Sequence, residues 1–71
     1  MTDKQKFEIA LIRKSRTKQD IADLLGLSLQ TVYNKINNVV DFKTREITKI
    51  CEFLKLTVKD RDAIFFAKSV E

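Results

Sequence analysis

Apolar residues recur along this chain at the three- and four-residue spacing of helices, in five segments with short connections between them. The first segment covers about residues 3–14, with Thr2 or Asp3 available as its cap. One apolar stripe of this segment consists of Phe7, Ala10 and Leu11. Ile9 and Ile12 fall on another face, so we expect this helix to pack on two sides.

The second and third segments lie between Thr17 and Asn38, where the chain reads TKQDIADLLGLSLQTVYNKINN. Thr17 is a predicted cap with Asp20 placed for a capping box, and Gly26 is predicted to end the helix in the left-handed conformation. Ser28 caps the next helix, which runs to about residue 37, and Asn38 tolerates the left-handed position after it. The residues expected to be buried in the first of these helices are Ile21, Ala22 and Leu25. This is the spacing of a helix-turn-helix, whose second helix is expected to face outward and bind a ligand such as the major groove of DNA.

The last two helices are predicted to begin near Thr44 and at Thr57. The fourth helix is expected to bury Ile47, Ile50, Cys51 and Leu54, and the fifth gives the tail an apolar patch with Ile64, Phe65 and Phe66. The chain contains no repeat and no linker. The predicted fold is therefore all-α, a five-helix domain over residues 1–71 with a helix-turn-helix over residues 17–38 as its second and third helices.

The third helix separates an apolar face from an amide-rich face. At about 100° per residue, Val32 and Ile36 face the core, and a second face is roughly 120° to 130° away. That second face carries Gln30, Tyr33, Asn34 and Asn37. Amide side chains match the N6/N7 edge of adenine, so Gln30 and Asn34 are predicted to contact DNA bases, and Tyr33 to contact a base or a phosphate. Leu29 lies at the edge of the core, where it either packs or touches a thymine methyl group.

Basic and polar residues flank this amide-rich face. They are predicted to contact DNA phosphates, because phosphate contacts position a protein around the bases that it reads. The predicted phosphate contacts are Lys18, Ser28, Lys35, Asn37, Lys43, Thr44 and Arg45.

Composition narrows the function further. The net charge of +4, from 14 basic and 10 acidic side chains, suits a polyanionic partner. There is one cysteine and no histidine, which argues against a disulfide, a metal site and an enzyme, and no cofactor or small-molecule ligand is expected. Cys51 is predicted to be an inert thiol, with a redox role as the alternative. No apolar run is long enough for a membrane span, so a reducing cytoplasm is the expected location.

Several further apolar residues exceed what a small monomer needs. Either they complete the core, with Ile9 and Ile12 beneath the tail, or some of them form a two-fold interface on paired DNA half-sites. They are Val39, Val40, Phe53, Phe65 and Phe66.

The segment TKQDIADLLGLSLQTVYNKIN resembles the helix-turn-helix of the lambda-repressor-like family, which includes phage Cro and repressor proteins and their bacterial relatives. The similarity rests on Ala22 four residues before Gly26, on Leu25 and Leu27 around that glycine, and on Val32 and Ile36. The later segment ITKICEFLKLT looks like that family's fourth helix, whereas Asn38 and Lys55 stand where the family usually has glycine.

This resemblance implies a repressor of phage Cro type in the cytoplasm of a bacterial host. It would bind an operator in double-stranded DNA as a homodimer and block the promoter by occlusion. The alternative is a helical protein-interaction module, such as an antirepressor or a regulator-binding protein, that does not itself read DNA.

Overall fold

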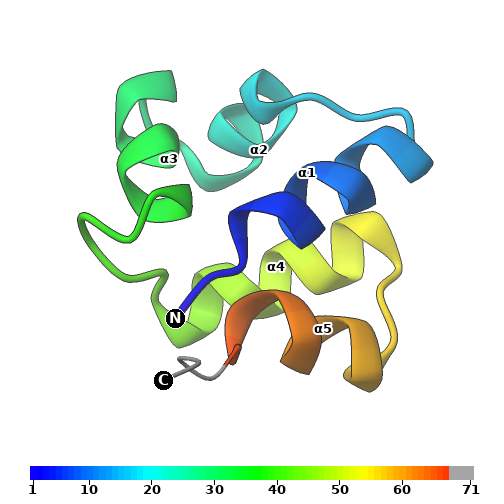
Figure 1. Cartoon of the computed structure of the whole chain (residues 1–71). Coiled ribbons are helices and arrows are strands. Elements are labelled where there is room, and N and C mark those ends of the chain that lie inside the picture. Colours follow the sequence, from blue (N-terminus) through cyan, green and yellow to red (C-terminus); the bar gives the residue numbers. More distant parts are fainter. Residues whose placement is uncertain (68–71) are drawn as a thin grey trace.

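The computed structural model describes residues 1–67 and consists of helices joined by short turns (Figure 1). The elements are α1 (Lys4–Arg13), α2 (Lys18–Leu25), α3 (Leu29–Ile36), α4 (Thr44–Leu54) and α5 (Val58–Phe65). The predicted all-α fold with five helices is confirmed over the described residues.

Short polar side chains fix where four of these helices begin. Each one accepts a hydrogen bond from the backbone N–H three residues ahead, at 3.0–3.1 Å, which satisfies a donor that has no partner within the helix. The four caps are Asp3, Thr17, Ser28 and Thr57. At Thr17 the predicted capping box is present, and Thr57 forms a second one, since Asp20 and Asp60 accept the N–H of the respective cap residue.

Left-handed residues follow four of the helices in the described part of the chain. Gly26 ends α2 at φ 67°, and Lys55 ends α4 at φ 54°. Ser15, at φ 56°, follows the cap residue of α1, and Asn38, at φ 62°, follows the cap residue of α3. The three non-glycine residues therefore adopt the conformation that glycine adopts at lower cost. The Asn38 side chain is also bonded to Thr2, because its Oδ1 accepts the Thr2 N–H at 2.8 Å and its Nδ2 donates to the Thr2 carbonyl at 2.9 Å.

In the view of Figure 1 the helices form two groups, with α2 and α3 above α1 and with α4 and α5 below it. The helices α2 and α3 pack against each other, and α4 contacts both α2 and α5. Along its length α1 packs on α5. This arrangement places α3 far from α5, at the opposite end of the view in Figure 1.

The core lies where these helices meet. Its buried apolar residues are Phe7, Ala10, Leu11, Ile21, Ala22, Val32, Ile36, Phe42, Ile47, Ile50, Leu54, Ile64 and Phe65. Phe7 stacks on Phe42 at 5.8 Å between ring centroids, and Phe65 meets both rings edge-on. Such aromatic pairs contribute about 1 kcal/mol each beyond the burial of their surface.

Some apolar positions differ from the expectation. The prediction that α1 packs on a second face is wrong, because Ile12 is 77% exposed and Ile9 is 44% exposed. Leu25 and Cys51 are half-buried rather than buried, although both pack against the core. Burial still raises the pKa of the Cys51 thiol; the Arg61 charge opposes this with a smaller effect, and the Asp62 charge adds to it.

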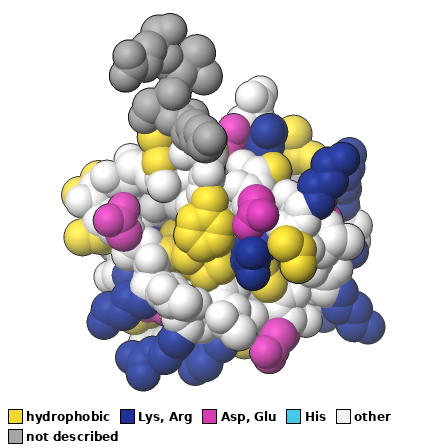
Figure 2. Space-filling view, turned by 90° about the horizontal axis from the view of Figure 1, so that it is seen from below, with side chains coloured by type: hydrophobic (Ala, Val, Ile, Leu, Met, Phe, Trp, Pro, Cys, Tyr) yellow, Lys and Arg dark blue, Asp and Glu magenta, His cyan; other side chains and the backbone are white. Residues whose placement is uncertain are grey.

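Two further observations concern the outside of the molecule. Seen from the side of α4 and α5, hydrophobic side chains reach the surface between clusters of Lys and Arg (Figure 2). Within residues 1–67, no helix has the length and apolar character that crossing a membrane requires.

Candidate nucleic-acid interface

The bend between α2 and α3 depends on two residue types. Gly26, at φ 67° and ψ 33°, reverses the chain, and the N–H of Leu27 then donates to the Ala22 carbonyl at 3.0 Å. Ala22 itself is fully buried where the two helices meet. Leu27 packs against the core and fixes the corner. The sequence predicted the left-handed Gly26 and the burial of Ala22.

The two faces of α3 are as expected. Val32 and Ile36 are fully buried, whereas Gln30 and Tyr33 are exposed and Asn34 is half-buried. The Gln30 Nε2 donates to the Asn34 Oδ1 at 3.1 Å. This bond holds the two amides side by side and leaves the Gln30 carbonyl oxygen and the Asn34 amide N–H groups directed away from it, as an acceptor and a donor for a ligand.

Leu29 takes an intermediate position between the two alternatives that the sequence left open. It is half-buried and lies outside the core cluster. Together with Ile12 and Tyr33 it lines a shallow groove of about 590 Å³ between α1 and the start of α3. Its side chain is therefore accessible from outside, next to the amide-rich face.

An ion pair joins α1 and α2 beside this groove. The Lys18 Nζ donates to the Glu8 Oε2 at 2.6 Å and lies 4.9 Å from the centre of the Tyr33 ring. The Lys18 hydrogen bond holds the pKa of the Glu8 carboxyl below its ordinary value of 4.5. A phosphate that binds Lys18 therefore has to compete with the Glu8 carboxylate, which sequence analysis did not foresee.

Lys35 requires a correction to the expected phosphate contacts. Its side chain is buried, and its Nζ donates to the Glu46 Oε1 at 3.0 Å and to the Asp41 carbonyl at 3.1 Å. An ammonium group enclosed in this way is not available to a phosphate. On the helical wheel Lys35 flanks the apolar face, and a long side chain at such a position can turn inward when another element supplies a carboxylate.

Glu46 is the carboxylate that sequence analysis missed. Burial raises its pKa, but the Lys43 N–H, which donates to the Glu46 Oε1 at 2.8 Å, and the Lys35 ammonium outweigh burial and hold the pKa below 4.5. A glutamate three residues after the N-cap residue is a recognisable capping signal, and here Lys43 is the N-cap of α4 and Glu46 is that glutamate.

The other predicted phosphate contacts lie at the surface. Lys43, Thr44 and Arg45 are exposed at the start of α4, and Ser28 and Asn37 are exposed at the two ends of α3. The Ser28 hydroxyl also caps α3, and this capping role is enough to explain why a serine stands here, without a phosphate contact.

The chain belongs to the family DUF739, described as proteins of unknown function, whose pattern it matches over residues 2–68. Comparison with curated proteins and with solved structures gives no match. The function has to be argued from the site itself.

Proposed function

We propose that this protein is a sequence-specific DNA-binding repressor of the phage Cro type, as its resemblance to the lambda-repressor-like family implies. The observation that carries the proposal is the amide pair on the outer face of α3, where Gln30 and Asn34 are held 3.1 Å apart by a hydrogen bond. The Asn34 N–H groups suit the N7 acceptor of adenine in the major groove, and the Gln30 carbonyl oxygen suits its N6 amino donor. A helix face that contacts only water usually carries charged residues such as Lys and Glu, not a row of amides.

Charges around α3 favour the same ligand. The exposed Lys43 and Arg45 follow the end of α3, and the free N–H groups at the starts of α2 and α3 attract anions. Neutral amides inside and cations outside are the arrangement that base reading and phosphate positioning require. Lys35 takes no part in this rim, since Glu46 holds its ammonium inside the protein.

The size of the molecule supports a dimer on the operator. Its extents are 34 × 25 × 21 Å. Paired half-sites in the major groove are about 34–36 Å apart along the helix axis, which is close to the longest extent of one copy. Two copies therefore fit side by side, and each reads one half-site. A compact dimer of this kind blocks a promoter by occupying it, without a separate effector domain.

A protein-interaction module is the second candidate function. The observation in its favour is the groove lined by Ile12, Leu29 and Tyr33, because exposed apolar residues next to α3 suit a protein as well as a thymine methyl group.

Selection of bound duplexes from a random pool distinguishes the two candidates. We expect an enriched, two-fold symmetric sequence with half-sites about 10 base pairs apart. Binding to that sequence should weaken with salt at a slope of log affinity on log salt near −7, for about eight neutralised phosphates. A pool without enrichment, together with no binding to any duplex at low salt, would contradict the repressor and favour the interaction module.

A further inference from the structure

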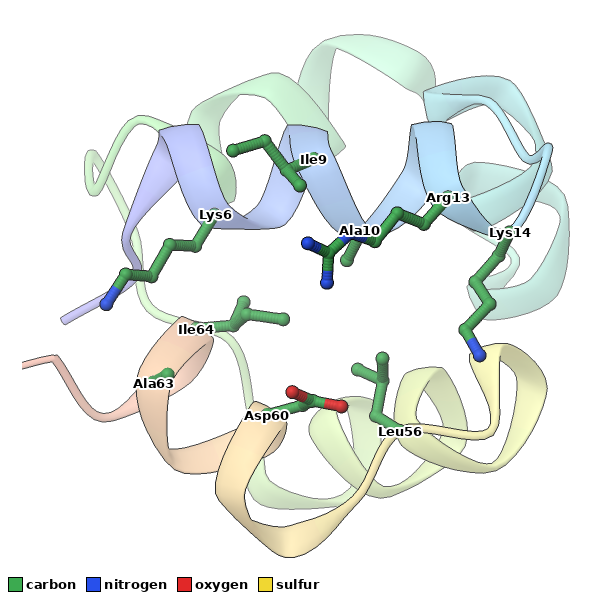
Figure 3. A pocket seen from close by; sticks show the side chains of 9 residues that line it. All are labelled: Lys6, Ile9, Ala10, Arg13, Lys14, Leu56, Asp60, Ala63 and Ile64. Carbon is green, nitrogen blue, oxygen red and sulfur yellow. The ribbon is translucent and has the colours of Figure 1, made fainter.

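A second groove, of about 360 Å³, lies between α1 and α5 on a face that includes no residue of α2 or α3 (Figure 3). Its apolar lining comes from Ile9, Ala10, Leu56 and Ile64. Ile9 is 44% exposed, so a large part of its apolar side chain faces water. A polar residue at this position would avoid that unfavourable exposure. The groove is therefore a pre-formed apolar surface that the proposed DNA contacts do not use.

Cations surround this apolar lining. In Figure 3 the Lys6 and Lys14 side chains reach over the two ends of the groove, and the Arg13 guanidinium lies over its middle. Among the described residues, none of these three side chains forms an ion pair within the protein. The one carboxylate of the lining belongs to Asp60, which accepts the Thr57 N–H at 3.4 Å in the capping box of α5. The groove thus carries a surplus of positive charge.

We propose that this groove docks an acidic amphipathic helix from a partner protein. Lys6 in α1 and Lys14, the cap residue that follows it, are eight residues apart, which corresponds to about 12 Å along a helix, or a little more than two turns. Carboxylates about two turns apart on a partner helix laid beside α1 match these cations. Apolar side chains between those carboxylates enter the groove, in the manner of a helix in a groove. This proposal is independent of the DNA-binding function, because it concerns another face.

Other occupants fit the groove less well. A second copy of this chain, related by a two-fold axis through the groove, places Lys6, Arg13 and Lys14 against the same three cations. Like charges opposed in this way cost free energy and disfavour the pairing. A nucleic acid satisfies the cations but leaves Ile9 and Leu56 without apolar contact.

Fluorescence anisotropy with a designed peptide tests the proposal. The probe is a labelled helical peptide of about four turns, with leucines on one face and glutamates two turns apart beside them. We expect it to bind the full chain about tenfold more tightly than the same peptide with lysines in place of the glutamates. The double variant Lys6→Glu/Lys14→Glu should weaken binding by about tenfold or more, and Lys6→Gln/Lys14→Gln by a smaller factor.

Matched variants separate the groove from general charge and hydrophobicity. Lys4→Glu/Lys49→Glu makes the same change of net charge away from the groove and should leave the affinity within about twofold. Ile9→Ser should weaken binding several-fold, whereas Ile12→Ser, on the same helix but outside this groove, should not. Thermal melts report whether each variant folds, and the glutamine pair replaces the glutamate pair if the latter does not.

Three results would overturn the proposal. The first is equal binding of the acidic and basic peptides, or equal loss in the groove variants and their controls. The second is a dimer, seen by sedimentation, that Ile9→Ser dissociates, since the groove would then hold a second copy. The third is displacement of the peptide by duplex DNA, which would place nucleic acid in the groove. The direct binding assay contains only the protein and the peptide, and DNA is added only in the displacement experiment, so a failure of the operator selection leaves the direct assay unaffected.

Discussion

At the scale of single residues, Glu46 connects the start of α4 to α3. Its Oε1 accepts both the Lys43 N–H and the Lys35 ammonium, and both members of the Lys35–Glu46 pair are nearly enclosed. A buried pair contributes little net stability compared with apolar residues, but removing one partner leaves the other charge without compensation. Glu46 therefore holds Lys35 inside and sets the position of α4 relative to α3.

We predict that Glu46→Gln destabilises the protein by about 3 kcal/mol at pH 7, measured by urea unfolding. The double variant Lys35→Met/Glu46→Gln should recover most of this loss, because no buried charge remains. If Glu46→Gln were as stable as the parent, the ammonium of Lys35 would not depend on this carboxylate.

Acid stability follows from the same carboxyl. The pKa of Glu46 is lower in the folded protein than its ordinary value of 4.5. The resulting stabilisation is complete above pH 4.5 and disappears as the pH falls through the folded pKa. Glu8, whose pKa is also lowered, contributes in the same direction. Between pH 5 and about pH 2 the parent should thus lose more stability than Glu46→Gln, and parallel stability curves for the two proteins would contradict this assignment.

The reading face makes a residue-scale prediction as well. Gln30→Ala should cost about 1–3 kcal/mol at the selected operator and relax specificity at one base pair. Lys43→Ala should weaken binding to all duplexes alike and make the salt slope shallower by about one. Titrations against the operator and its single-base variants measure both effects. Undiminished operator binding by Gln30→Ala would remove that side chain from the reading face.

At the scale of helices and turns, Asn38 and Lys55, two of the left-handed non-glycine residues, differ in what their side chains do. Lys55 ends α4 without a hydrogen bond from its side chain to any described residue, whereas the Asn38 amide bonds to both backbone groups of the buried Thr2. The φ angles are similar at the two positions, 62° and 54°, but asparagine tolerates the left-handed conformation better than lysine. Replacement by glycine should therefore change the stability of the protein in opposite directions at Lys55 and at Asn38.

We predict that Lys55→Gly stabilises the protein by about 0.5–1 kcal/mol, because glycine adopts this conformation at lower cost. Asn38→Gly should instead destabilise it by about 1 kcal/mol, because the loss of two hydrogen bonds to Thr2 exceeds the relief of strain. Urea unfolding of both variants provides the comparison. Equal effects at the two positions would mean that the Asn38–Thr2 contact contributes nothing.

Features of this chain that depend on near neighbours could be predicted from the sequence. Thr17, Gly26 and Ser28 fix the helix-turn-helix through hydrogen bonds that span three to five residues. The faces of α3 follow from helical periodicity. In contrast, the burial of Lys35 depends on Glu46, eleven residues away in a different helix. No local pattern distinguishes such a lysine from one at the surface, and the same limit applied to Ile12, whose exposure depends on which helices pack on α1.

At the scale of the whole molecule, the N-terminal segment connects the two groups of helices. The Thr2 backbone is bonded to Asn38 after α3, and the Asp3 N–H donates to the Ile64 carbonyl of α5 at 2.7 Å. The Phe7, Phe42 and Phe65 rings also meet one another, from α1, the connection before α4, and α5. Sequence analysis assigned no role to Phe42, since it lies in a connection and its partners are distant along the chain.

This aromatic cluster leads to a prediction for the stability of the entire fold. Phe42 is only 8% exposed, and its replacement by alanine removes both ring contacts and leaves a cavity between three elements, which should cost about 3 kcal/mol in urea unfolding. Phe66→Ala is the matched control: that ring is 53% exposed, and we expect a change within about 0.5 kcal/mol. Both substitutions remove the same atoms, so the difference between the two losses of unfolding free energy measures how much the aromatic cluster contributes to the packing of α1, α4 and α5. A similar loss in both variants would show that these helices are held together by the surrounding aliphatic residues instead.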